Sequence, residues 1–322
     1  MHLPTFSASC PEIVYHYCSV ETFYHIVNNK TLRLSDIEKS NDFMEKKWAI
    51  RQCIEHIKNN LDNPLYACAL HPVFASELLE EMQVQFQKYN TVILASCFSS
   101  ESDLLSQWRG YGDNGYGVSI GFNAGSEFRP AFERAQSYLG LKGTEYLPSG
   151  FLFHSIQYTT EQIETICMKL FCAYTRWHPS HVPVKKAANE LVRLLYPALP
   201  FFKSSAFSEE REWRCVYYPH LPAPPYETEN LDESSFQKLI AAQLKEQEID
   251  EFLLLPLDYR LRQANLVAYR DMRFPSSGRP FIQSVTIGPK CALDRETVKV
   301  FLEKNGLPIA LDNIHLSDVS YR

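Results

Sequence analysis

The chain has 322 residues, of which 45% are hydrophobic and 22% are charged. These proportions are ordinary for a globular protein and exclude disorder over most of the length. A net charge of −6 argues against a general nucleic-acid coat, which would need a large excess of lysine and arginine. It leaves room for a local basic groove.

Cysteine use and the N-terminal residues indicate the compartment. The nine cysteines include no Cys-x-x-Cys spacing, and their odd number fits buried free thiols in a reducing cytosol better than a disulfide framework. Residues 1–5 lack the basic and apolar regions of a signal peptide, and no apolar run approaches the length that spans a bilayer. We therefore expect a cytoplasmic protein with no membrane partner.

Hydrophobic periodicity and turn residues predict a mixture of strands and helices. Strands are expected at 13–18, 31–35, 91–98, 118–122, 151–159, 211–218, 253–257, 266–270 and 282–287. Helices are expected after Ser19, from Asn41 to about Leu61, and at about 73–87, 104–108, 161–177, 184–196 and 294–305. A loop rich in proline is expected at 221–230.

This order lacks both an internal repeat and a regular βαβ rhythm. It favours an α+β fold with a mixed, largely antiparallel sheet at its core. We expect residues 1–322 to form one elaborated domain, with helical insertions near 41–90 and 161–200.

The strongest motif is Glu210-Arg211-Glu212-Trp213-Arg214. Alternation along a strand places Glu210, Glu212 and Arg214 on one face. Two carboxylates about 7 Å apart repel, and each raises the pKa of the other, which a strand that served only stability would avoid. One interpretation is a site that binds a sugar hydroxyl or stabilises an oxocarbenium-like centre, with an arginine orienting the carboxylate. The alternative is a solvent-facing edge.

Two polar clusters accompany the expected first and second strands. In Tyr15-His16-Tyr17 the tyrosines share one face and His16 takes the other, where it is either a ribose ligand or a core histidine. Ser35 and Asp36 open a polar stretch that either caps a helix or holds a ligand.

Residues 107–117 contain four of the chain's 12 glycines, together with Trp108 and Tyr111. The segment lacks the Gly-Lys-Ser/Thr of a phosphate loop. Its aromatic rings favour a pocket wall over a simple turn with a packed tryptophan. His178 and His181 lack a third ligand nearby, so no metal site is expected.

These motifs resemble one bacterial family in their order along nearly the whole chain. They are Y-H-Y-C-S, L-R-L-S-D, N-D-F-M-E, S-Q-W-R-G-Y-G-D-N-G-Y-G-V-S-I-G-F, E-R-E-W-R, V-T-I-G-P and L-S-D-V-S-Y-R. The family is the domain of unknown function numbered twenty-nine seventy-one.

A more distant resemblance is to the ADP-ribosyltransferases, through the Tyr/His strand, the strand ending in serine and the later E-x-E strand. It implies an ADP-ribosyltransferase-like sheet, with Glu212 as the catalytic glutamate and Glu210 facing the acceptor. It also implies that His16 anchors the NAD ribose, Ser35 shapes the wall of the second strand, and Tyr17 or Tyr111 stacks on nicotinamide. The candidate NAD-binding residues are His16, Tyr17, Ser35, Trp108, Tyr111 and Arg214.

The leading hypothesis is therefore an NAD-consuming enzyme, an ADP-ribosyltransferase or NAD glycohydrolase, in bacterial anti-phage defence or a toxin system. NAD is the expected co-substrate, no permanently bound cofactor is expected, and a protein or nucleic acid could be the acceptor. One alternative is a non-catalytic nucleotide-binding or interaction module. Another is a metal-dependent nuclease that uses Asp42, Glu45, Glu210 and Glu212.

Overall fold

The computed structural model shows an α+β protein with a mixed, mostly antiparallel sheet. It describes residues 11–39, 45–60, 72–88, 92–124, 151–165, 167, 183–218, 254–262, 264–274 and 280–321. Within these residues the sheet has ten strands, and only β9 and β10 pair in parallel. The α+β class and the largely antiparallel sheet are thus confirmed, whereas the arrangement as one domain stays a prediction.

The element bounds are as follows. The strands are β1 (Ile13–Cys18), β2 (Thr31–Asp36), β3 (Leu94–Ser99), β4 (Val118–Asn123), β5 (Phe151–Ser155), β6 (Glu212–Tyr217), β7 (Asp258–Arg262), β8 (Asn265–Arg273), β9 (Ile282–Ile287) and β10 (Ile314–Leu316). The α-helices are α1 (Val20–Asn29), α2 (Glu45–Asn59), α3 (Pro72–Lys88), α4 (Leu105–Gly110), α7 (Val184–Leu195) and α9 (Arg295–Lys304). The 3-10 turns that bear on the site are η1 (Ile37–Lys39), η5 (Tyr196–Phe201) and η6 (Ser205–Glu210).

Local signals define several of these elements. The Ser19 hydroxyl accepts a hydrogen bond from the backbone N–H of Thr22 and so caps α1. The helix ends at Lys30, whose φ of 52° turns the chain into β2. Asp294 caps α9 in the same way through the N–H of Thr297. These caps confirm the expected starts of both helices.

The structure corrects the expected strand at 253–257. Of this run, Leu254 forms only an isolated bridge with Met272, and its side chain is buried in the core. The strand, β7, begins at Asp258 and forms a hairpin with β8. The apolar run reflects burial of Leu254, and Pro256 cannot donate to a ladder of hydrogen bonds. Three expected features lie outside the described residues. They are the start of the 41–61 helix, most of the 161–177 helix, and the 221–230 loop.

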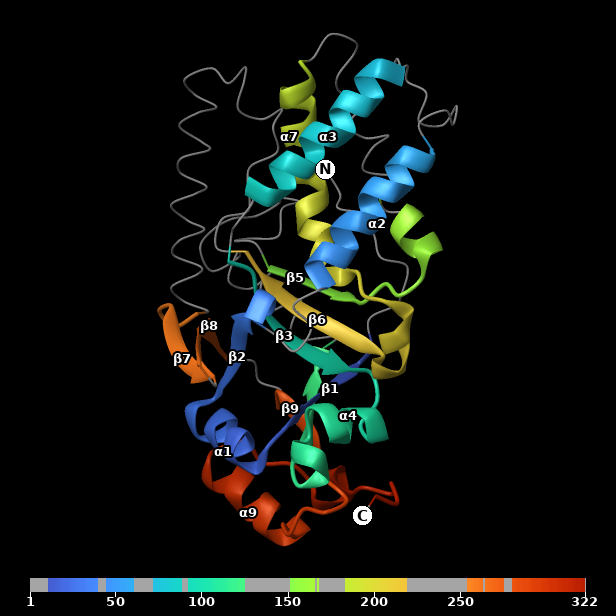
Figure 1. Cartoon of the computed structure of the whole chain (residues 1–322). Helices are drawn as coiled ribbons and strands as arrows, with labels where there is room; N and C mark the ends of the chain where they lie inside the picture. The colour runs from blue at the N-terminus through green and yellow to red at the C-terminus, as the bar shows by residue number, and fades with distance from the viewer. Residues whose placement is uncertain are drawn as a thin grey trace.

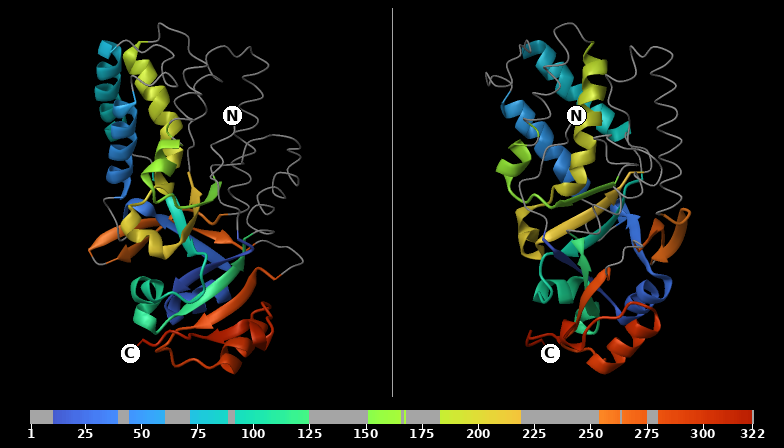
Figure 2. Two further views of the ribbon diagram at one scale, coloured as in Figure 1. Left: turned by 90° about the vertical axis from the view of Figure 1, so that its right-hand side faces the viewer. Right: turned by 180° about the vertical axis from the view of Figure 1, so that it is seen from behind.

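Two apolar clusters lie against the sheet. One is closed by α1 and α9, which lie at the lower end of the molecule in Figure 1, and includes Phe23 and Leu302. The other lies under α2, α3 and α7, which cover β5 and β6 from above, and includes Met82, Leu191 and Val216. The views from the side and from behind show the same two ends, with the sheet between them (Figure 2).

The sheet splits along one edge of β3. There β2 pairs with the first residues of β3, whereas β1 meets β3 only through Tyr15 and Ser99. The other edge of β3 pairs with β6 over its whole length. Between β1 and β2, Nδ1 of His16 lies 2.9 Å from the backbone oxygen of Cys97. An imidazole thus occupies the position of a missing strand partner.

Among the described residues, no helix combines the length and the apolar character needed to cross a membrane.

Candidate functional site

A tight turn separates the two glutamates of the E-x-E motif. The 3-10 turn η6 ends at Glu210, Arg211 is left-handed with φ 46° and ψ 48°, and β6 begins at Glu212. Glu210 therefore lies before the strand, which corrects the expected alternation of Glu210 with Glu212 on one strand. The left-handed Arg211 changes the direction of the chain between the two glutamates.

A lysine lies between these carboxylates. Nζ of Lys203 is 2.6 Å from Oε2 of Glu210 and 3.1 Å from Oε2 of Glu212. Arg214 clamps Glu212 from the strand, with Nε 2.6 Å from Oε1 and Nη2 3.1 Å from Oε2. The two negative charges are thus compensated by two cations. We call these four residues the charged centre.

The backbone of the neighbouring segments positions the cations. The backbone N–H of Lys203 donates to the backbone oxygen of Gln157, and the backbone N–H of Gln157 donates to that of Phe201. Because Gln157 lies two residues after β5, these bonds hold the end of η5 against the end of β5. Nη1 of Arg214 donates to the backbone oxygen of Pro200 at 2.6 Å. The side chains of Lys203, Glu212 and Arg214 are almost completely buried, and that of Glu210 is 13% exposed. Only Glu210 therefore reaches the surface.

The two carboxyls differ in how readily they take a proton. Burial alone would raise the pKa of Glu212, but Arg214 and Lys203 outweigh it and lower that pKa to about 2. For Glu210 the balance is reversed: burial and the charge of Glu212 raise the pKa, although Lys203 opposes them. Glu212 is consequently a fixed anion at neutral pH, whereas Glu210 is the carboxyl nearer to accepting a proton.

Two tyrosines and a cysteine complete the surroundings. The Tyr111 hydroxyl lies 3.5 Å from Oε1 of Glu210, and the backbone N–H of Glu212 donates to the Tyr158 hydroxyl at 2.8 Å. Burial raises the pKa of both phenols, so they remain neutral at physiological pH. The Cys97 thiol hydrogen-bonds to the Glu212 carboxylate, and burial raises its pKa. The site thus contains O–H groups beside a carboxylate pair.

The exposed side of the centre is bordered by Arg211 and Glu101, which form an ion pair across its edge. The hydroxyl of Ser99 donates to the backbone oxygen of Glu210 at 2.8 Å, and Ser100 donates to that of Arg211. Tyr111 is 41% exposed. A ligand approaching Glu210 would therefore meet an aromatic ring, a guanidinium and a carboxylate.

Tyr17 and Trp108 support this arrangement from below. Tyr17 donates its hydroxyl to the backbone oxygen of Glu101 and accepts from the N–H of Leu104. The rings of Tyr17 and Trp108 meet edge to face at 4.8 Å, and Trp108 donates Nε1–H to Asp103. Trp108 is fully buried, so it anchors α4 and the adjoining Tyr111 and does not form an exposed pocket wall.

His16 lies apart from the charged centre. In the register of the strands, Tyr15, Ser99 and Glu212 lie in one row on one face, as the alternation of β1 predicts. The His16 ring instead contacts Phe98 of the core, with 5.8 Å between ring centroids. Burial lowers the pKa of His16. The structure thus places Tyr15, and not His16, on the face of Glu212.

Ser35 is also distant from Glu212, although both lie on the same face of the sheet. Ser35 pairs with Ala95 at the opposite end of β3. Four residues along β3 and two strand spacings place Ser35 roughly 16 Å from Glu212. The structure therefore brings together Glu210, Glu212, Arg214 and Tyr111, but not His16 or Ser35.

Sequence reasoning missed Lys203, Tyr158 and Cys97. The local signal for Lys203 is a lysine that follows the apolar run 198–202, since a buried lysine requires a carboxylate partner. The partner's identity depends on the pairing of β5 with β6, which no local pattern specifies.

The carboxylates proposed for a metal-dependent nuclease are not brought together by the described residues. Asp42 and the side chain of Glu45 lie outside the described part of the chain. Glu210 and Glu212 face Lys203 and Arg214, and the described residues contain no group of three or more potential ligands that could hold a metal ion.

The fold and the site define an α+β protein with a buried, charge-compensated carboxylate pair at the edge of a split sheet. Residues 107–215 match the family described as Protein of unknown function (DUF2971), which confirms the resemblance to that family over this segment. The matched segment contains all four residues of the charged centre, together with Tyr111 and Tyr158. No curated protein and no solved structure matches the chain.

Proposed function

We propose that the protein consumes NAD, by transfer of ADP-ribose or by hydrolysis, at the surface of the charged centre. The observation that carries this proposal is the pairing of a fixed anion, Glu212, with a more exposed carboxyl, Glu210, whose pKa is raised. An N-glycosidic bond at a ribose breaks through a positively charged, oxocarbenium-like state, which carboxylates stabilise. The ADP-ribosyltransferase-like fold and a role in bacterial defence or toxicity are parts of the same proposal.

In the proposed reaction the bond between the ribose C1′ and the nicotinamide nitrogen breaks, and its electron pair leaves with nicotinamide. Oε1 of the Glu210 carboxylate, which no cation binds among the described contacts, stabilises the positive charge at C1′. A water molecule or an acceptor hydroxyl then forms the new bond to C1′, and its proton passes to Glu210. The exposed ring of Tyr111 is available to stack on nicotinamide. The guanidinium of Arg211, the residue next to Glu210, is available to bind a phosphate of NAD.

The contacts divide the roles between the two glutamates. Both oxygens of Glu212 accept hydrogen bonds from cations, and its side chain is only 5% exposed, so it acts by positioning Lys203 beside Glu210. Glu210 has its Oε1 directed towards Tyr111 and is the carboxylate that a substrate can reach. His16 and Ser35 have no part in this version of the site.

The test measures nicotinamide release from NAD by the full chain and by Glu210→Gln. Loss of a group that takes up a proton reduces such rates by about 100-fold or more, so Glu210→Gln should bind NAD yet release nicotinamide at least that much more slowly. Glu209→Gln is the matched control, because Glu209 is exposed and adjacent. The proposal fails if wild type neither binds nor cleaves NAD, or if the two variants have equal rates.

A binding module without turnover is the second candidate. It is favoured by the complete satisfaction of the Glu212 carboxylate, because a buried ion network can also serve to fix a single conformation. In that case wild type and Glu210→Gln would both bind NAD, and neither would release nicotinamide.

A further inference from the structure

A second group of basic side chains lies at the opposite end of the sheet, on the β7–β8 hairpin. Ser35, Tyr269 and Asp258 are in register across β2, β8 and β7, so they share a face. Arg260 and Arg262 follow Asp258 at two-residue intervals on β7 and lie on that same face. Arg33, two residues before Ser35, joins them from β2.

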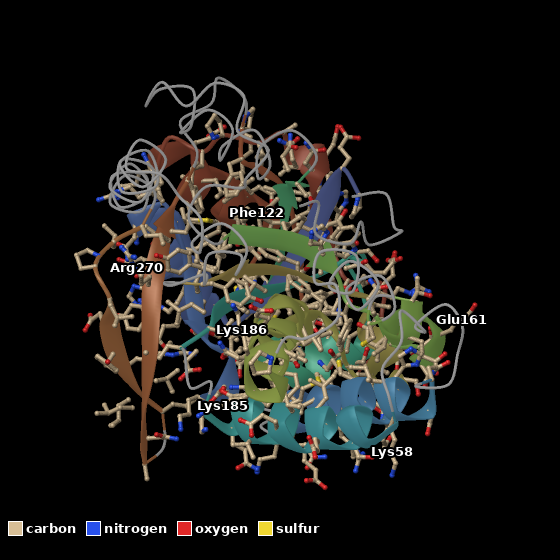
Figure 3. The ribbon with its side chains drawn as sticks, turned by 90° about the horizontal axis from the view of Figure 1, so that it is seen from above. Lys58, Phe122, Glu161, Lys185, Lys186 and Arg270 are labelled. Atoms are coloured by element: carbon tan, nitrogen blue, oxygen red, sulfur yellow. The ribbon has the colours of Figure 1, made fainter. Side chains whose placement is uncertain are left out.

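Arg260 contacts β2, and Arg262 contacts the turn η1 that follows it. Nη2 of Arg260 lies 3.4 Å from Oγ of Ser35, and Nη1 of Arg262 donates to the backbone oxygen of Lys39 at 3.1 Å. All five residues of β7 are exposed. Seen from above, the hairpin, marked by Arg270, stands at the rim of the molecule beside the helices (Figure 3). The cluster is therefore open to a ligand.

The carboxylates on this face are engaged by other partners. Asp271 holds Arg33 through two hydrogen bonds of 2.8 and 2.9 Å, while the Arg33 guanidinium stacks 3.6 Å over the ring of Tyr269. Asp258 accepts from the Tyr269 hydroxyl at 2.8 Å and from a backbone N–H. Within the part of the chain that the structure describes, no carboxylate lies at ion-pair distance from Arg260.

Arg260 is thus held near two other arginines and makes no ion pair with a carboxylate of the described residues, although the more distant charge of Asp271 partly offsets theirs. Partial burial, with the charges of Arg33 and Arg262, lowers the pKa of Arg260. A bound anion would remove this repulsion, and a guanidinium matches the geometry of a phosphate through paired N–H donors. The Ser35 hydroxyl supplies a further donor at the same position.

The arginine cluster is separate from the charged centre. Ser35 is roughly 16 Å from Glu212 along the same face. The neighbour of Ser35 on β3 is Ala95, which is buried in the apolar cluster under α2, α3 and α7, so an apolar surface adjoins the arginine cluster on the side of the charged centre.

We propose that Ser35, Arg260 and Arg262 form a site for a phosphate group, carried either by a free nucleotide or by a nucleic-acid strand. The site is independent of the reaction proposed for the charged centre. It satisfies the expectation that a chain with net charge −6 can contain a local basic surface.

Two probes distinguish the sources of the phosphate. Inorganic pyrophosphate, followed by titration calorimetry, represents a nucleotide, and a fluorescent single-stranded oligonucleotide, followed by anisotropy, represents a nucleic acid. Tighter binding of the oligonucleotide, weakening steeply with salt, identifies a strand. Binding of pyrophosphate without the oligonucleotide identifies a nucleotide.

The variants test which residues bind. Arg260→Gln should weaken binding by about tenfold or more, because a hydrogen bond to a charged group is lost, and Arg260→Lys should fall between it and wild type. Arg51→Gln removes an exposed arginine of α2 and should bind like wild type. Without ligand, Arg260→Gln should melt no lower than wild type, since repulsion is relieved.

Two results would overturn the site. One is that wild type binds neither probe at low salt. The other is that Arg260→Gln and Arg51→Gln bind equally well. A melting temperature of Arg260→Gln clearly below that of wild type, with unchanged binding, would show that Arg260 serves only the fold.

Discussion

Replacing Lys203 with methionine tests whether the charged centre is held together by that lysine. Lys203 contacts both Glu210 and Glu212, and its side chain is 4% exposed. Methionine has a similar length but no charge, so the variant leaves Glu210 without its cation and Glu212 with Arg214 alone. Removing one partner of a buried ion pair lowers the free energy of unfolding by about 3–5 kcal/mol, and we expect a loss of this size near pH 7.

The dependence on pH sharpens this prediction. In wild type, the pKa of about 2 for Glu212 against an ordinary 4.5 corresponds to roughly 3 kcal/mol of stability, which is present above pH 4.5 and is lost as the pH falls towards 2. In Lys203→Met the pKa of Glu210 rises further. A carboxyl whose pKa is higher in the folded than in the unfolded state favours folding while it is protonated. That contribution to the free energy of unfolding is lost as the pH rises through the folded-state pKa. The deficit of the variant should therefore be larger near pH 7 than near pH 5.

Urea unfolding followed by tryptophan fluorescence measures the free energy of unfolding near pH 7 and near pH 5. Lys299→Met is the matched control, because Lys299 forms a more exposed pair with Glu303 four residues later in α9 and should change stability by only about 0.5 kcal/mol. Equal losses for Lys203→Met and Lys299→Met near pH 7 would refute the reasoning. So would a deficit of Lys203→Met that is larger near pH 5 than near pH 7.

Two further substitutions test the packing around the site, with urea unfolding as the measurement. Gly117→Ala places a Cβ 2.0 Å from a backbone oxygen and should lower the unfolding free energy by about 2 kcal/mol or more, whereas Gly110→Ala meets nothing within 4 Å and should change it by less than about 0.5 kcal/mol. His16→Leu leaves the Cys97 carbonyl without its imidazole donor and should cost about 1–3 kcal/mol. Because burial lowers the pKa of His16, wild type loses stability as the pH falls through the ordinary value of 6.5, and this part of its pH dependence should be absent from His16→Leu.

The elements that the sequence predicts best are those with local signals. The β1–α1–β2 unit follows from an alternating strand, the Ser19 cap and a helix with one apolar face, and all three are confirmed. The strand 258–262 was missed because every residue in it is exposed, so it lacks the one-sided burial on which pattern analysis relies.

Within the site, the sequence located Glu210, Glu212 and Arg214 but misjudged their electrostatics. The expected repulsion between the glutamates is relieved by Lys203, which lies several residues earlier in the chain and reaches them only because η5 is joined to the end of β5. For His16, strand alternation correctly predicted a face opposite to that of Tyr15 and Tyr17. The split between β1 and β2, where the His16 ring bonds to Cys97, depends on strand pairing, and only the folded chain shows that pairing.

The asymmetry of the charged centre is the main argument that it serves more than stability. Apolar side chains of similar volume stabilise a core at least as well as a buried ion network, so stability alone does not explain why three charged residues are buried here. The left-handed Arg211 turns Glu210 towards the surface while Glu212 remains held by two cations. One carboxyl is thus kept ionised and the other is left able to exchange a proton beside an exposed tyrosine. Two carboxyls whose pKa values are driven apart at an accessible edge form an arrangement in which acid and base roles are commonly found.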